Sequence, residues 1–333
     1  MEWKTNLEEL SKVSYLEIKE LDGRIIPLQP GFNENNEWEM WLPGPTGLVK
    51  MQSTEPVESH YFAKDRVSEM DGYLDFSNCM LKRAYYPDVA YHIEAILDDL
   101  HNLGASVEKL ELFFDDWQKE HSRVTRRFVS TELEYIFNVC RSMFDLLQLI
   151  IRKLWDRVRL LDEDENARKK QLKTSFAKMI LTGDNLLSLD EIREKHFVPS
   201  LLAEFYYRQS GFFKWLRDYR DHILHHGKTF QFIFLTERGF AVSLRDQPFA
   251  SLDIWNEKNT IPNKLGSVRS AVAYVITKTI MALEEFTQVL KKTIELPYDI
   301  APNYHVFVRG RHNEALLTLK DYVEEQAWQN ESS

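Results

Sequence analysis

The sequence predicts a mainly α-helical protein that begins with a small mixed region of strands and helices. From about residue 87 onward, apolar residues recur three and four positions apart over long stretches, as on one face of an α-helix. Before residue 60, five prolines interspersed with glycines separate short β-prone pieces. We therefore expect a helical domain over residues 121–333. An N-terminal region of short strands followed by helices precedes it over residues 1–120, and the sequence does not indicate its role.

The N-terminal half of the chain contains the most regular helical pattern. Residues 88–102 have helical periodicity, Gly104 is expected to interrupt it, and residues 106–120 continue it. A long and almost entirely apolar helix is expected over residues 131–160. Thr131 or Ser130 would cap that helix, because Glu134 stands three residues after Thr131 as in a capping box. The breadth of its apolar surface places this helix at the centre of the core.

Further elements are expected after this helix. Another helix is predicted over residues 167–181, and a short helix follows that Ser188 caps together with Glu191. Pro199 fits the first turn of a helix that runs to His226, and Gly227 fits its C-terminal stop.

The last third of the chain should add a β-hairpin, a helix and a short tail. The segments FQFIFL and FAVSLR flank TERG, which predicts a hairpin inserted in the helical domain, with Gly239 in the turn. Residues 265–292 form a second long amphipathic pattern. One strand-like piece, YHVFVRG, and a terminal helix around residues 314–328 complete the chain.

Several classes of protein are disfavoured by composition. The chain has 2 cysteines, Cys79 and Cys140, without CxxC spacing, so the sequence offers neither a disulfide framework nor a thiolate zinc site. The first residues are polar and acidic, unlike a secretory signal, and no stretch of about 18 residues is uncharged and apolar. We therefore expect a cytoplasmic protein with no membrane association.

Charge is unevenly distributed along the chain. The net charge is −10, with 24 Asp and Glu against 11 Lys and Arg in residues 1–120, but 13 Lys and Arg against 8 Asp and Glu in residues 121–178. A local basic surface on an acidic protein can still bind a nucleic-acid backbone. The expected RNA-binding residues are the basic run Arg168, Lys169, Lys170 and Lys173. The alternative is a solvated helix face crossed by salt bridges.

One polar stripe runs along the predicted helix over residues 131–160. Its members follow one another at spacings of three or four: Glu134, Asn138, Arg141, Asp145, Gln148 and Arg152. Such a stripe on an otherwise apolar helix faces a cleft, a partner subunit or water. We expect a polar network within the chain or across a dimer, with Asn138, Arg141 and Asp145 supporting a site and Arg141 and Asp145 orienting its histidine.

The strongest functional signal is the run RDYRDHILHHG at residues 217–227, near the end of the helix that begins after Pro199. On a helical wheel, Arg217, Asp221 and His225 fall on the face opposite the apolar residues. An imidazole exchanges protons near neutral pH, and a guanidinium binds phosphate oxygens with two donors. These groups suit metal-free phosphodiester cleavage, which needs a base, an acid and a fixed cation.

The segment from Arg220 to His225 resembles the R-x4-H motif of the HEPN superfamily, in the form with a polar residue after the arginine. The resemblance covers roughly residues 121–295 and implies an all-helical bundle that dimerises. It further implies that two copies of the motif form one site, and that the protein is a metal-independent RNase of a toxin–antitoxin or phage-defence system. One subgroup of the superfamily carries a modifiable tyrosine two residues after the histidine. This chain has Gly227 at that position, so we do not expect that modification.

Two registers of the motif compete. Arg217 with His222 fits the same pattern three residues earlier, but His225 is nearer the helix end and lies on the polar face. Arg220 and His225 stand about 140° apart on an ideal helix, which favours a composite site from two subunits. His222 and His226 could share a zinc ion at four-residue spacing, but the Glu of an HExxH motif and an evident third ligand are missing. We assign no metal and no cofactor.

The sequence thus predicts a dimeric endoribonuclease with His225 as general acid or base, Arg220 as phosphate clamp and Asp221 orienting either. Arg217, His222 and His226 would support them. An antitoxin or a defence-complex protein is a further expected partner. The alternative is a non-catalytic helical module that binds a nucleotide or a partner protein.

Overall fold

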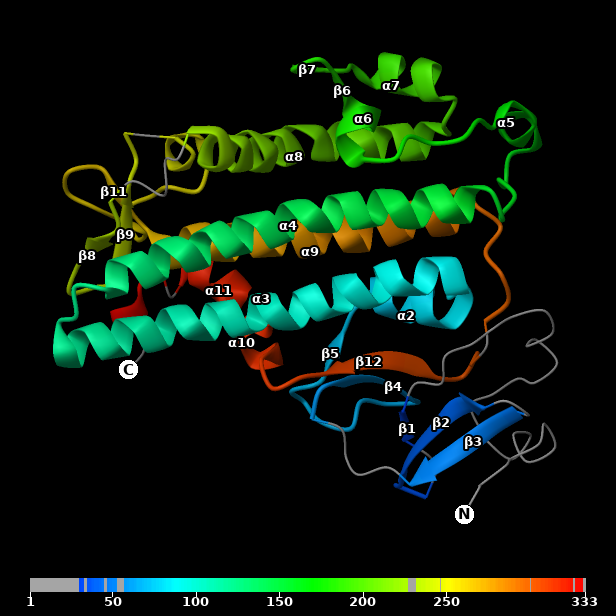
Figure 1. The fold of residues 1–333 in the computed structure, drawn as a ribbon, viewed down its shortest axis with the longest axis horizontal. Coiled ribbons are helices and arrows are strands. Elements are labelled where there is room, and N and C mark those ends of the chain that lie inside the picture. The colour runs from blue at the N-terminus through cyan, green and yellow to red at the C-terminus, as the bar shows by residue number, and fades with distance from the viewer. Residues whose placement is uncertain are drawn as a thin grey trace.

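The computed structural model describes residues 30–32, 35–44, 47–52, 57–226, 232–245, 247–299, 301–325 and 327–331, and for residues 41–44, 47–52, 221–226, 324 and 331 it describes the backbone alone. Four long helices, α3, α4, α8 and α9, run side by side along the longest axis of the molecule (Figure 1). A sheet that contains β12 lies beyond α2 and α3, and a smaller sheet lies at the opposite end of the bundle (Figure 1). The expectation of a mainly α-helical fold is confirmed.

The long helices are α3 (Pro87–Glu120), α4 (Thr125–Trp155), α8 (Ser200–His226) and α9 (Val268–Thr293). The shorter described helices are α2 (Asp75–Arg83), α5 (Glu163–Arg168), α6 (Phe176–Ile180), α7 (Leu189–His196), α10 (Asn313–Leu317) and α11 (Leu319–Glu324). Apolar faces of the four long helices meet in one core, since burial of such faces stabilises long helices more than intrinsic propensity does.

A six-stranded sheet has the order β3-β2-β1-β4-β12-β5. Its strands are β1 (Gly31–Phe32), β2 (Trp38–Gly44), β3 (Gly47–Gln52), β4 (Ser59–Ala63), β5 (Gly72–Tyr73) and β12 (His305–Arg309). β1 and β4 pair in parallel and every other described pair of this sheet is antiparallel. The predicted strand over YHVFVRG is therefore confirmed, and it lies between two strands of the N-terminal region.

The two other sheets are small. One has the order β10-β11-β9-β8 and consists of β8 (Phe234–Leu235), β9 (Phe240–Ser243), β10 (Thr260–Ile261) and β11 (Leu265–Ser267). The other pairs β6 (Leu181–Thr182) with β7 (Asn185–Leu186). β8 and β9 form the predicted hairpin, with Phe234 opposite Ala241 and Gly239 at a φ of 154° in the connection. Two of the short β-prone pieces expected before residue 60, SYLEIKEL and GRIIPL, lie outside the described residues.

One buried cluster extends from Phe62 to Leu319 and takes in residues of α2, α3, α4, α8 and α9. The sequence suggested a division after residue 120, which is the last residue of α3. In the structure α3 lies against α4, and β12 returns from the C-terminal part of the chain to the N-terminal sheet. The described residues on the two sides of that division therefore share one core.

Two predicted helix boundaries were wrong for local reasons. α4 begins at Thr125, so Thr131 lies inside it, where its hydroxyl donates to the carbonyls of Arg127 at 3.1 Å and Phe128 at 2.9 Å. A threonine can bond to the preceding turn in this way without ending a helix. Gly104 does not interrupt α3. A glycine stands there because His312 packs against the helix and leaves no room for a side chain. A Cβ at Gly104 would lie 2.8 Å from the Cβ of His312.

The predicted helix over residues 167–181 is also wrong. α5 ends at Arg168, α6 begins at Phe176, and the residues between them run along α4 in non-helical conformation. The predicted terminal helix around residues 314–328 is replaced by α10 and α11. Local predictions with a specific cap were confirmed: Ser188 and Glu191 form a capping box at the start of α7, and α8 begins directly after Pro199.

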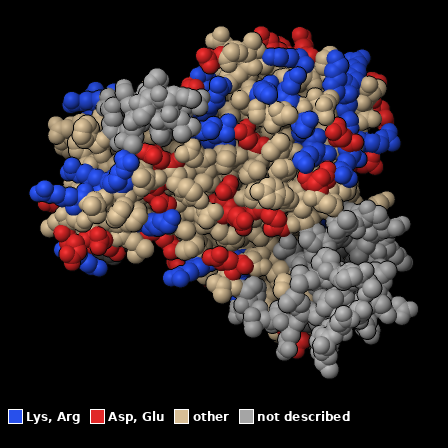
Figure 2. Space-filling model, in the orientation of Figure 1, with Lys and Arg blue, Asp and Glu red and all other residues tan. Residues whose placement is uncertain are grey.

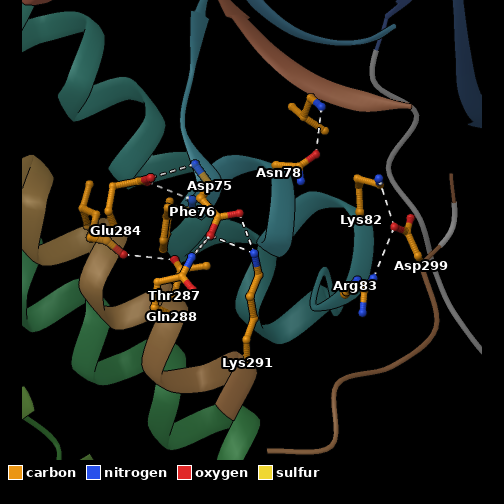
Figure 3. Close-up of polar contacts among 12 residues, drawn as sticks. Asp75, Phe76, Asn78, Lys82, Arg83, Glu284, Thr287, Gln288, Lys291 and Asp299 are labelled. Carbon is orange, nitrogen blue, oxygen red and sulfur yellow. Dashed lines mark hydrogen bonds and ion pairs between the residues drawn. The ribbon is translucent and has the colours of Figure 1, made fainter. Parts of the chain in front are cut away.

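The helix α2 is held to α9 by a cap that comes from α9 itself. The Glu284 carboxylate accepts hydrogen bonds from the backbone N–H groups of Asp75 and Phe76, each at 3.0 Å (Figure 3). These are two of the donors that the first turn of a helix leaves unsatisfied. The Asp75 side chain in turn accepts from Lys291 at 2.7 Å and from Gln288. A carboxylate from a distant helix thus replaces the local N-cap that Leu74 cannot provide.

The other end of α2 joins the sheet and the segment after α9. The Asn78 side chain accepts from the backbone N–H of Val306 in β12 at 3.0 Å (Figure 3). Lys82 is buried and pairs with Asp299 at 3.0 Å, and Arg83 pairs with the same carboxylate at 3.5 Å. These contacts fix α2 as the connection between the bundle and the six-stranded sheet.

Three histidines lie where α3 meets the sheet. His60 of β4 is buried and its ring lies 5.9 Å from the ring of His101 of α3. The His60 Nε2 atom is buried with no hydrogen-bond partner. The Nδ1 atom of His312 lies 2.9 Å from a carboxylate oxygen of Glu108. Burial, with a smaller contribution from His101, lowers the pKa of His60 from 6.5 to about 3.

This junction predicts a specific loss of stability in acid. The unfolded chain protonates an imidazole near pH 6.5, whereas folded His60 stays neutral down to about pH 3. The stability that neutral His60 contributes is therefore fully present above pH 6.5 and is lost as the pH falls from 6.5 to 3. Burial lowers the pKa of His101 as well, so it adds to the same loss. Asp99 acts oppositely, because burial raises its pKa to about 6. The free energy of unfolding of wild type should fall by about 1.4 kcal/mol per pH unit relative to His60→Phe between pH 6 and 4.

Urea unfolding at several pH values measures this difference. His305→Gln is the matched control, because it removes an exposed imidazole from β12. Its profile should run parallel to that of wild type. Parallel profiles for wild type and His60→Phe would contradict the prediction.

Candidate functional site

The helix α8 carries the R-x4-H run and starts at a well-defined point. Pro199 directly precedes its first residue, and the backbone N–H of Ser200 donates to the carboxylate of Glu165. An acceptor at a helix N-terminus satisfies one of the free N–H groups and suits the positive end of the helix dipole. The helix then continues to His226.

Contacts along α8 show that it runs antiparallel to α4. The Tyr206 hydroxyl donates to the Gln148 side chain at 2.6 Å near the start of α8. Further along, the ring of Phe137 lies 5.1 Å from Trp215 and 4.9 Å from Tyr219. Residue numbers rise along α8 as they fall along α4, so Arg220 lies towards the beginning of α4.

The arginines of the motif are partly exposed. Arg217 and Arg220 are half-buried, while Asp218 between them is exposed and pairs with Lys214 one turn earlier. Tyr219 is buried against Phe137. This alternation keeps one face of α8 in the core and leaves the two guanidinium groups at its margin, as the helical wheel predicts.

The remaining residues of the motif belong to the part of α8 that is described by its backbone alone. Asp221, His222, His225 and His226 lie in the last two turns of the helix, and their side chains are outside the description. Gly227, expected as the C-terminal stop, lies outside the described residues altogether. The predicted placement of the motif at the end of a long helix is nevertheless confirmed.

The polar stripe of α4 forms a network within the chain. Gln148 is buried and donates to the backbone carbonyl of Lys173 at 2.8 Å, and Arg152 donates to that of Leu172 at 3.2 Å. Asp145 accepts from the backbone N–H of Phe176 at 3.1 Å. The stripe therefore satisfies the backbone of the non-helical segment between α5 and α6, as buried polar groups require.

Arg141 and Asp145 lie at a different level of the bundle from the motif. They pair with each other at 2.7 Å, and the Arg141 guanidinium lies 5.6 Å from the centre of the Phe213 ring. Phe213 precedes His225 by twelve residues, which is about 18 Å of helix. Asn138 donates to the carbonyl of Glu134 one turn earlier in α4. The structure thus separates Arg141 and Asp145 from the end of α8 that they were expected to support.

Glu134 is the member of the stripe that faces the motif helix. Burial raises the pKa of Tyr219, and the nearby Glu134 carboxylate raises it further. The sequence placed Glu134 in the stripe but did not single it out. The position of Glu134 could have indicated this. When two helices pack antiparallel, a residue near the start of one lies beside the last turns of the other.

The basic residues from Arg168 to Lys173 make different contacts. Lys169 donates to the carbonyls of Trp155 and Val158, the latter at 2.6 Å, at the C-terminal end of α4. A lysine in this position satisfies carbonyls that the helix end leaves free and suits the negative end of its dipole. Burial lowers the pKa of the Lys169 ammonium group. Arg168, Lys170 and Lys173 are exposed, and the Lys170 ammonium lies 3.6 Å from the centre of the Phe197 ring.

A loop covers the side of α8 next to the motif. The indole N–H of Trp215 donates to the carbonyl of Pro248 and to the hydroxyl of Ser251, both at 3.1 Å. The ring of Phe249 lies 6.2 Å from that of Phe137. Because Trp215 precedes Arg217 by two residues, this loop braces the helix immediately before the candidate site.

No family model, curated protein or solved structure matches the chain. Within the described ranges, no cluster of three or more His, Cys, Asp and Glu side chains could hold a metal ion. No helix in that part of the chain combines the length and apolar character that a membrane span needs.

The role of Lys169 can be separated from that of its neighbours by substitution. Lys169→Met should lower the free energy of unfolding by about 1–3 kcal/mol, because carbonyls at the end of α4 lose a charged donor. Lys173→Met should change it by less than about 0.5 kcal/mol, because that side chain is exposed. Urea unfolding of the two variants measures this. Equal stabilities would show that Lys169 does not cap α4.

Proposed function

We propose that the chain is a metal-independent endoribonuclease that cleaves RNA through attack of a 2′-hydroxyl, at a composite site formed by two copies of the chain. The observation that carries this proposal is the position of the R-x4-H run. It occupies the last turns of α8, directly after a segment that aromatic contacts fix against α4. Phage defence or a toxin–antitoxin system is the proposed biological setting.

The chemistry assigns a role to each residue of the motif. His225 takes the proton from the 2′-hydroxyl, or gives one to the departing 5′-oxygen, and a second copy of the motif supplies the other imidazole. Arg220 binds the non-bridging oxygens as negative charge builds on phosphorus. Asp221 orients either group. The products are a 2′,3′-cyclic phosphate and a free 5′-hydroxyl.

The half-buried state of Arg220 supports its assignment as the clamp. A fully exposed guanidinium is mobile, whereas a fully buried one could not reach a polymeric substrate. Arg220 is held at the margin of the core beside buried Tyr219. Within the described ranges, no hydrogen bond or ion pair engages the Arg220 guanidinium. In the proposal, this helix holds the guanidinium where it binds the phosphate.

RNA cleavage by purified full-length protein in excess EDTA tests the proposal. Wild type should cleave, while Arg220→Ala and His225→Ala should each lower the rate by roughly 10²–10⁴-fold, the usual contribution of such groups. His305→Gln should cleave like wild type. Equal cleavage by wild type and His225→Ala, or no cleavage by either, would contradict the assignment.

The product ends and the second register of the motif can be examined in the same assay. Products that end in 2′,3′-cyclic phosphate are expected, whereas 5′-phosphate ends would indicate metal-dependent hydrolysis. His222→Ala should retain more activity than His225→Ala. The reverse order would assign the site to Arg217 and His222.

A further inference from the structure

A hollow of about 310 Å³ lies between α5 and α7, at the start of α8. Its lining includes Glu165 and Arg168 from α5, Asp190, Arg193 and Glu194 from α7, and Phe197 directly after α7. Figure 2 shows acidic and basic side chains mixed over this end of the molecule, where α5 and α7 lie in Figure 1. Its volume is at the lower end of the range for small-ligand sites.

This hollow is remote from the R-x4-H run. It adjoins Ser200, the first residue of α8, whereas Arg220 follows twenty residues later. A helix rises about 1.5 Å per residue, so about 30 Å of helix separate the two places. A mononucleotide bound in the hollow therefore does not reach the proposed cleavage site.

The hollow presents two guanidinium groups from different elements. Within the described ranges, no ion pair or hydrogen bond uses the side chain of Arg168 or Arg193. The Glu165 carboxylate is attracted by the Arg193 guanidinium and also accepts the N–H of Ser200, so it lies between the hollow and the start of α8. Two guanidiniums that face one space offer the bidentate donors that a phosphate group prefers.

Phe197 provides an apolar surface at the same place. Its side chain is 41% exposed, and its φ of 55° ends α7 in left-handed conformation. The Lys170 ammonium lies 3.6 Å from the ring centre, and its flexible side chain can move from the ring to an incoming anion. An exposed ring beside cations is the arrangement that stacks a nucleic-acid base next to its phosphate.

We infer that this hollow binds a nucleotide, with the base against Phe197 and the phosphate between Arg168 and Arg193. The carboxylates of Asp190 and Glu194 then accept hydrogen bonds from the base. A carboxylate has acceptors only, so it selects bases that present N–H groups on the Watson–Crick edge. Guanine offers two such groups side by side, which match the two oxygens of one carboxylate.

The charge balance of the hollow favours a nucleotide over simpler ions. Among the lining residues, Arg168 and Arg193 oppose Glu165, Asp190 and Glu194, and the formal charges cancel only when Lys170 beside Phe197 is counted as a third cation. Free phosphate would gain little from this field and leave the carboxylates without donors. A simple cation would meet the arginines. A guanine nucleotide instead supplies an anion and neutral N–H donors in one molecule. This inference does not depend on RNA cleavage.

Isothermal titration of full-length wild type with GMP, guanosine, UMP and inorganic phosphate tests it. GMP should bind, and guanosine, UMP and phosphate should each bind at least about tenfold more weakly. Guanosine lacks the phosphate, UMP lacks the two adjacent N–H groups of guanine, and phosphate lacks the base. Arg193→Gln and Phe197→Asn should each weaken GMP binding by about tenfold or more. Asparagine tolerates left-handed backbone, so Phe197→Asn should keep the fold.

Arg159→Gln is the matched control, because it removes an exposed guanidinium that pairs with Glu163 away from the lining residues. It should bind GMP like wild type. Absence of GMP binding to folded wild type, or equal binding by wild type, Arg193→Gln and Phe197→Asn, would overturn the inference. Phosphate binding as tight as GMP binding would overturn it in favour of an anion site. Equal binding of UMP and GMP would overturn the role of the carboxylates.

Discussion

The aromatic contact between α4 and α8 is the interaction on which the arrangement of the other elements depends. Phe144 of α4 lies 5.7 Å from Phe213 of α8, and Phe176 of α6 completes the group at 5.1 Å from Phe144 and 4.9 Å from Phe213. Aromatic rings bury large areas and prefer such tilted or edge-on contacts. One aromatic ring from each of α4, α6 and α8 thus packs in a single group. Because close-packed cores tolerate little displacement, this group sets how α8 lies along α4.

This packing also explains the buried polar groups around it. The aromatic contact brings the segment between α5 and α6 onto α4, and its carbonyl and N–H groups then need partners away from water. Gln148 and Asp145 supply two of them. The stripe of α4 is therefore the polar complement of a non-helical segment. The same segment places Lys169 at the end of α4 and Lys170 over Phe197.

Features with local causes could be predicted from the sequence. The capping box at Ser188, the start of α8 after Pro199 and the hairpin around Gly239 depend on residues a few positions apart. Features with distant causes could not. Gly104 has the sequence signature of a helix break, but its partner is His312, more than two hundred residues later. The order of strands in the larger sheet likewise depends on pairings that no local pattern encodes.

The candidate site shows the same division. The position of the motif on the end of a half-exposed helix followed from periodicity, whereas the tasks of Asp145 and Lys169 did not, because their partners are backbone groups of distant residues. The sequence suggested that Asp145 belongs to a polar network and orients the histidine of the site, and that Lys169 binds RNA. Glu134 could have been found from the antiparallel arrangement of α4 and α8, once that arrangement was assumed.

The place of β12 in the larger sheet has a consequence for how the chain acquires its structure during synthesis. β12 pairs with β4 and β5, which precede it by more than two hundred residues, so these two strands have no partner on that side until residue 309 has left the ribosome. The α3 and α4 pair can form from adjacent residues long before then. Non-local strand pairing is slow, and unpaired strand edges invite association with other chains. The newly made strands β4 and β5 thus depend on protection until β12 has been synthesised.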